Sequence, residues 1–144
     1  MLSQKARYSI RAIQHLADEW GKGVLAMHDI AEKQNIPPKF LAVILSELTR
    51  AGLIISHRGR EGGYELAISP LDIRYGDIVR IMRGSLALVP CASRYAYEKC
   101  KNCVPEEECR LRSLLLKVRD QTAEVLDTVT FADPIELLPS FDDE

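Results

Sequence analysis

The chain has 144 residues, of which 47% are hydrophobic and 28% are charged. This is enough material for one soluble domain that buries its core without cross-links. No uncharged run approaches the roughly 20 apolar residues that span a bilayer, so we expect a cytoplasmic protein without a membrane partner. The net charge of -2 hides an asymmetry: residues 1–84 carry 12 Lys and Arg against 9 Asp and Glu, whereas residues 85–144 carry 7 against 12. The basic N-terminal part is therefore the candidate for binding an anionic partner.

Three helices are predicted in the first part of the chain. Apolar residues at three- and four-residue intervals predict a helix over about 3–20, which Gly21 and Gly23 end. A short second helix begins at Ile30, and "NIPPKF" then forces a turn because a residue before proline disfavours the helical conformation. Pro38 suits the first position of a third helix, which ends at Gly52. Its inward residues are Leu41, Ile44, Leu45 and Leu48. This pattern indicates a helix-turn-helix, although a generic helical hairpin also fits it.

A basic β-hairpin is predicted directly after the third helix. "GLIISHRG" and "GYELAIS" read as two strands, and "REGG" reads as the turn between them. Such a hairpin beside a recognition helix is a wing, whose glycines let the backbone approach a phosphate backbone closely. A nucleotide-binding loop is excluded because that loop precedes a helix rather than a strand. We therefore expect double-stranded operator DNA as the partner. The predicted contacts are Lys39, Ala42, Val43, Arg50, His57, Arg58, Gly59, Arg60, Gly62, Gly63 and Tyr64.

A long C-terminal helix is predicted to mediate dimerisation. After a short helix in "DIRYGDIVRIMRG", residues 111–133 show apolar residues in alternating four- and three-residue steps, and Pro134 ends the pattern. This repeat is typical of a helix that packs lengthwise on another helix. The helix could instead cover its own core, but the sustained repeat favours a homodimer. The predicted interface residues are Leu111, Leu115, Val118, Thr122, Val125 and Val129.

All four cysteines lie between the last two predicted helices. Cys91, Cys100, Cys103 and Cys109 have the spacing C-x8-C-x2-C-x5-C. In a reducing cytosol, clustered thiols are metal ligands or reactive groups rather than disulfides. Three interpretations stay open, namely an iron-sulfur cluster, a structural zinc ion and redox-active thiols without a metal. We find no nucleophile-base pair and no catalytic carboxylate pair, so we do not expect an enzyme.

Several segments of the chain resemble the Rrf-type winged-helix transcription regulators. The most specific is the wing motif R-G-x-x-G-G-Y-x-L, present as Arg58 to Leu66. The helix-turn-helix "DIAEKQNIPPKFLAVILSELTRAGLI", the "YGDIVRIMRG" helix, the cysteine loop and "VLDTVTFAD" extend the resemblance over about residues 1–133. The family includes the iron-sulfur cluster regulator, the nitric-oxide-sensing repressor and the rhizobial iron regulator. The resemblance implies a dimer that binds operator DNA and, in many members, a [2Fe-2S] or [4Fe-4S] cluster on three cysteines of this loop.

The resemblance also implies a ligand set, from which this sequence departs. The three family cysteines fall on Cys91, Cys103 and Cys109. One branch uses a histidine as fourth ligand where this chain has Arg112, and a guanidinium does not normally bind metal. Cys100 is then the candidate fourth ligand, with a ligand from a partner subunit as the other possibility. Ala42 stands where many relatives carry glutamate, a change that would alter sequence preference on DNA.

We therefore predict a mainly α-helical fold with a small β-hairpin wing. It comprises a winged helix-turn-helix domain (1–84), a cysteine-rich cluster-binding loop (85–110), a dimerisation helix (111–133) and an acidic tail (134–144). The expected function is a DNA-binding repressor whose operator affinity an iron-sulfur cluster controls in response to iron, oxygen, nitric oxide or redox state. Zinc is the alternative cofactor. The alternative function is a small iron-sulfur or zinc protein of electron transfer or redox relay.

Overall fold

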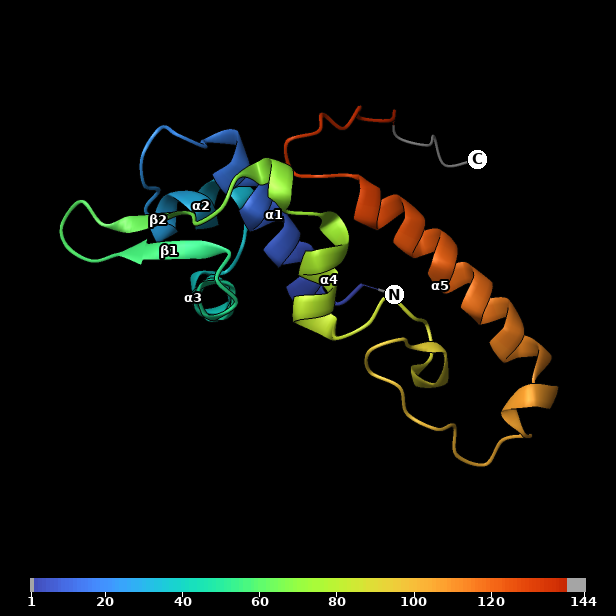
Figure 1. Cartoon of the computed structure of the whole chain (residues 1–144). Coiled ribbons are helices and arrows are strands. Elements are labelled where there is room, and N and C mark those ends of the chain that lie inside the picture. The colour runs from blue at the N-terminus through green and yellow to red at the C-terminus, as the bar shows by residue number, and fades with distance from the viewer. Residues whose placement is uncertain (1, 140–144) are drawn as a thin grey trace.

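The computed structural model describes residues 2–139, and in this range the fold is mainly helical with one β-hairpin (Figure 1). The elements in chain order are α1 (Gln4–Asp18), α2 (Met27–Gln34), α3 (Pro38–Arg50), β1 (Ile54–His57), β2 (Gly63–Leu66), α4 (Tyr75–Arg83) and α5 (Arg110–Thr128). Short 3-10 turns lie at Pro70–Asp72, Pro90–Ala92 and Glu106–Glu108. This confirms the predicted fold class. No helix in residues 2–139 is both long and apolar enough to cross a membrane.

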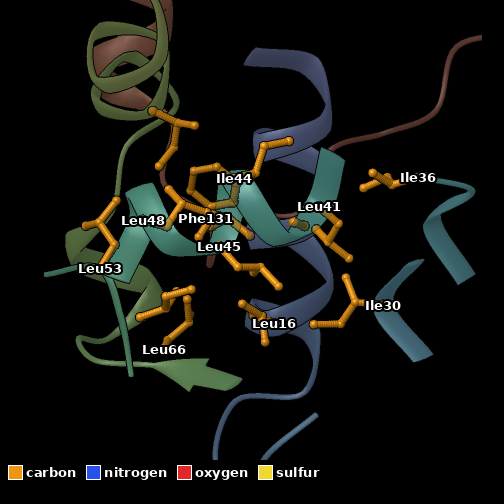
Figure 2. Close-up of a cluster of buried hydrophobic side chains, with 14 of the residues drawn as sticks. Leu16, Ile30, Ile36, Leu41, Ile44, Leu45, Leu48, Leu53, Leu66 and Phe131 are labelled. Atoms are coloured by element: carbon orange, nitrogen blue, oxygen red, sulfur yellow. The ribbon is translucent and has the colours of Figure 1, made fainter. Parts of the chain in front are cut away.

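The core forms around the inward face of α3. The four residues predicted to point inward, Leu41, Ile44, Leu45 and Leu48, are all fully buried. They pack with apolar side chains of α1, α2 and the hairpin in one cluster, shown in Figure 2. A fully buried leucine or isoleucine contributes about 1.5–3 kcal/mol by leaving water. This inward face therefore fixes which residues of α3 point outward.

Local backbone chemistry sets the tight turn between α2 and α3. Asn35 follows α2 in the left-handed conformation with φ 50°, which asparagine tolerates better than most residues. The Ile36 N–H donates to the Ala31 carbonyl and closes the end of α2. Pro38 occupies the start of α3 as expected. α2 begins at Met27, three residues before the predicted start, and no side chain caps it.

The hairpin is anchored to the segment that precedes α2. β1 and β2 pair antiparallel from Ile54↔Leu66 to His57↔Gly63. Leu25 and Tyr64 exchange two backbone hydrogen bonds of 2.8 Å, so Leu25 extends the hairpin on its second strand. Gly63 is required here because a Cβ atom would collide with the Leu25 carbonyl. The strands are shorter than the predicted segments.

The last helix ends earlier than predicted. α5 stops at Thr128 and Val129 is extended, so the prediction of a helix over 111–133 that Pro134 ends is wrong at its C-terminal end. The helix ends at Thr128 because the residues that follow it pack against the segment around Ile73 and Tyr75. The Phe131 ring stacks on Tyr75 with centroids 4.1 Å apart, and its N–H donates to the Ile73 carbonyl. Phe131 is a member of the core cluster, so residues 129–131 pack on the 1–84 unit rather than extending the helix.

The predicted acidic tail is described only in part. Residues 134–139 are exposed and have no regular structure. Residues 140–144 lie outside the described residues.

Candidate functional site: the outer face of α3 with the hairpin, and a cysteine-lined cavity

The outer face of α3 is a solvent-exposed strip opposite the buried face. Lys39, Ala42, Val43 and Arg50 are all exposed, and Val43 is 55% exposed although its side chain is apolar. Exposed residues at intervals of three and four lie along one side of a helix. The strip is thus available to enter a DNA groove while the opposite side is held by the core.

Two features beside this strip were missed by the sequence analysis. On the α1 side, Lys5 pairs with Glu47 at 2.6 Å, and the ring of Tyr8 meets Phe40 edge-on. On the hairpin side, a groove between α3 and the strands is lined by Arg50 and by four residues that carry a hydroxyl group. Three of these hydroxyl-bearing residues, Ser46, Thr49 and Ser56, were not predicted, whereas Arg50 and Tyr64 were predicted as DNA contacts. The α3 hydroxyls could have been found from sequence, because Ser46 and Thr49 continue the spacing that begins at Ala42.

The tip of the hairpin presents the predicted basic residues. Arg58, Gly59 and Arg60 are exposed, and Gly59 has a φ of 115° that only glycine adopts readily. The ring of His57 is already engaged, because its Nε2 lies 3.1 Å from Glu65 Oε1. The two arginines are therefore the freer cations for a phosphate backbone.

Three predicted contact residues have a structural role within the hairpin. A Cβ atom on Gly62 would collide with the His57 carbonyl, and Gly63 is buried against Leu25. Tyr64 is half-buried and packs on the core. The lack of space for a Cβ atom thus explains why residues 62 and 63 are glycines. Contact of Gly62, Gly63 and Tyr64 with DNA stays a prediction.

All four cysteines line one cavity of about 410 Å³, called the cysteine cavity below. Its walls are the Pro90–Ala92 turn, the loop around residues 98–106 and the first turns of α5. All four cysteines are free thiols. Cys91 is buried, Cys109 is half-buried, and Cys100 and Cys103 are exposed. The structure thus brings together side chains that lie up to 18 positions apart in the sequence.

The donor set of the cysteine cavity suits an iron-sulfur cluster. Thiolates are the usual ligands of such clusters, and the backbone N–H of Arg112 already donates to Cys109 Sγ at 3.3 Å. Cys109 caps the N-terminus of α5, where the helix dipole favours negative charge. Hydrogen bonding with the neighbouring Cys103 thiol raises the pKa of the Cys100 thiol. Within residues 2–139 no group of three or more His, Cys, Asp or Glu side chains is already arranged to hold a metal ion.

Much of the apolar side of α5 is exposed to solvent in the described part of the chain. Leu111, Leu114 and Val125 are 62%, 57% and 61% exposed, and no residue of the helix is fully buried. Leu115 and Thr122 are half-buried, and Val118 is 37% exposed. Val129, predicted as the last interface residue, lies just beyond the helix and accepts a hydrogen bond from the Tyr75 N–H.

These features together define a winged-helix DNA-binding protein with a thiol-lined cavity beside its last helix. The family model Rrf2, described as iron-dependent transcriptional regulator, matches residues 2–136. The chain belongs to this family of transcriptional regulators, and it is therefore a DNA-binding regulator and not an enzyme.

Individual relatives agree with the family assignment over most of their length. An rrf2-like HTH-type regulator of Rhodobacter capsulatus is 37% identical over 136 residues, which cover 92% of this chain and 91% of that protein. The structure of CymR, the global cysteine regulator of Bacillus subtilis, superposes with a TM-score of 0.75 at 33% identity, covering 92% of this chain and 94% of CymR. IscR of T. potens superposes with a TM-score of 0.72 at 34% identity, covering 92% and 84%.

Proposed function

We propose that this regulator is a homodimeric repressor whose affinity for operator DNA is set by an iron-sulfur cluster in the cysteine cavity. The observation that carries the proposal is that every cysteine of the chain lines this one cavity, at the start of α5. Cys91, Cys100, Cys103 and Cys109 would hold the cluster. When bound, such a cluster supplies a labile redox centre.

The description of the family as iron-dependent regulators supports this cofactor. The resemblance to family members that carry a cluster in the same loop supports it independently of the cavity. The donor chemistry agrees, because four thiols and no histidine line the cavity. The alternatives to an iron-sulfur cluster at this site are a zinc ion and metal-free thiols.

The exposed apolar residues of α5 support the homodimer. Each such side chain contributes about 1.5–3 kcal/mol when a partner covers it fully. Leu111, Leu114 and Val125 lie on this helix with most of their surface in solvent. A second copy of α5 would cover them in the lengthwise packing that their spacing predicts.

The connection between the cavity and α5 supplies a route from cofactor to DNA. Cys109 is directly followed by α5, so a change in the loop shifts the start of the helix that would join the two protomers. The spacing of the two α3 helices on DNA then changes. A tenfold change in operator affinity needs a coupling of only about 1.4 kcal/mol.

The proposal is tested by anaerobic purification followed by absorption spectroscopy, iron and sulfide analysis, and operator binding with loaded and cofactor-free protein. We expect iron with acid-labile sulfide, and operator affinities that differ between the two forms. Zinc without sulfide would indicate a structural zinc site. A protein that contains neither iron nor zinc would indicate a site of metal-free, redox-active thiols. Equal operator affinity of the loaded and empty forms would refute control by the cluster. The alternative of a small electron-transfer protein is disfavoured because the chain belongs to a family of DNA-binding regulators.

A further inference from the structure

Arg112 connects three walls of the cysteine cavity. It lies in the first turn of α5, and its Nε donates to the Cys91 carbonyl at 2.9 Å. A terminal nitrogen of the same guanidinium lies 3.5 Å from Glu106 Oε2. Only about a quarter of each of these two side chains is exposed. One planar cation thus contacts the turn that carries Cys91 and the turn that precedes Cys109.

The contacts of Arg112 continue on both sides. The other carboxylate oxygen of Glu106 accepts a 2.6 Å hydrogen bond from the Tyr97 hydroxyl, which ties in the middle of the loop. Two helical turns further along α5, Arg119 donates to the Ala92 carbonyl at 2.8 Å. Two arginines on α5 therefore hold successive carbonyls of the Pro90–Ala92 turn. Each bond between a guanidinium and a neutral acceptor is stronger than one between neutral groups.

The charge of Arg112 also bears on the cavity. Arg112 and Glu106 both line it beside the four thiols. Ligand thiolates and each added electron bring negative charge, so a nearby cation favours the reduced state of a bound centre and a nearby carboxylate disfavours it. Arg112 and Glu106 would thus have opposite effects on the reduction potential of a bound centre, although they form one ion pair with each other.

We propose that Arg112 is a positioning residue for the cysteine cavity, holding Cys91 in place in the cofactor-free protein and balancing the negative charge of the ligands. Its holding role rests on the contacts above. Its charge role rests on the proposed function. Arg112 thus occupies the sequence position at which one family branch carries its fourth ligand, and at this position it supplies contacts to the Cys91 carbonyl and to Glu106 instead of a ligand.

The holding role is tested on full-length, cofactor-free protein with R112Q and R112K, using R110Q as the matched control because Arg110 is exposed and lies outside the cavity lining. The rate of Cys91 alkylation by iodoacetamide is followed by mass spectrometry, with exposed Cys100 in the same sample as internal reference. We expect Cys91 to react about tenfold faster in R112Q, because local opening exposes it. We expect the rate of Cys91 alkylation in R112K to lie between the rates in R112Q and wild type. The lysine ammonium keeps the positive charge, but it lacks the planar guanidinium that bonds the Cys91 carbonyl and Glu106 at the same time. Circular dichroism verifies that each variant is folded.

The charge role is tested by redox titration of anaerobically loaded protein. We expect a lower reduction potential in R112Q, a higher one in E106Q, and values near wild type in R112K and R110Q. Mere loosening of the loop would shift R112Q and E106Q in the same direction, because both break the same contact. Unchanged Cys91 alkylation in R112Q and R112K would overturn the holding role, and shifts of equal sign would overturn the charge role. A wild-type protein that holds no cluster would refute the proposed function, while the alkylation result would still decide the role of Arg112.

Discussion

Arg80 on α4 and Asp127 in the last turn of α5 are joined by two parallel hydrogen bonds, both 2.7 Å long. Gly76, one turn earlier on α4, leaves room for this pair, because a Cβ atom there would overlap the Asp127 carboxylate. The pair lies where α5 returns to the DNA-binding part, beside the stacked rings of Tyr75 and Phe131. It therefore connects the proposed dimerisation helix to the helix that packs on α1.

The Arg80–Asp127 pair makes stability depend on pH in the acidic range. Hydrogen bonding to Arg80 lowers the pKa of Asp127 below its ordinary value of 3.8. The contribution of Asp127 is therefore fully present above the unfolded pKa and disappears as the pH falls through the lower folded pKa. We expect D127N to lower the free energy of unfolding at pH 7 by about 1–2 kcal/mol, since the pair is partly exposed. The difference from wild type should shrink below about pH 3.8.

Urea unfolding at pH 7, 5, 4 and 3 measures this difference. D72N is the matched control, because Asp72 is an exposed aspartate of the Pro70–Asp72 turn. G76A should mimic D127N, because its methyl group displaces the carboxylate. A constant difference between wild type and D127N over the whole range would contradict this account.

The arginines at the hairpin tip should carry a salt-dependent part of operator binding. We expect R58A/R60A to bind operator DNA more weakly, and the slope of log K against log salt to flatten by about one unit for each phosphate that the variant no longer neutralises. Fluorescence anisotropy at several salt concentrations measures both quantities. K117A removes an exposed charge from α5 and serves as control. A weaker affinity with an unchanged slope would place the arginines away from phosphates.

The apolar side of α5 should hold the dimer together. We expect L115D/V118D to give monomers, because two carboxylates would replace side chains that contribute about 1.5–3 kcal/mol each when covered. Sedimentation velocity measures the oligomeric state. L71D is the control, since Leu71 is 67% exposed and lies outside α5. An intact dimer of L115D/V118D would mean that another surface joins the protomers.

Cys100 distinguishes ligation by four cysteines from ligation by three. We expect C91A, C103A and C109A to abolish or destabilise the cluster, and C100A to change its absorption spectrum and lower its iron content, because the cluster then has one thiolate ligand fewer. Anaerobic reconstitution followed by iron and sulfide analysis measures this. A C100A variant with a normal cluster would place the fourth ligand elsewhere, for example in the partner subunit.

Features with a short-range or periodic origin were predictable from the sequence. The start of α3 at Pro38, its four buried residues and the hairpin that follows all have local signals, namely proline geometry, a period of three to four and glycines in a turn. The cysteines could likewise be recognised as a group, because they lie close together in the sequence. Each of these patterns lies within about 20 consecutive residues, over which backbone propensity and amphipathicity act directly.

Contacts between residues far apart in the sequence could be identified only in the folded chain. The pattern of apolar residues continued past Thr128, but the stack of Phe131 on Tyr75 turns the chain back and ends α5 there. The role of Arg112 could not be predicted from the sequence, which showed only that it replaces a histidine of other family members. Its contact with the Cys91 carbonyl joins residues 21 positions apart. Local sequence patterns thus predicted the wing, the set of thiols and the helices, apart from the start of α2 and the end of α5. The fold decided which carbonyls, carboxylates and rings they meet, because such pairs arise from packing rather than from spacing along the chain.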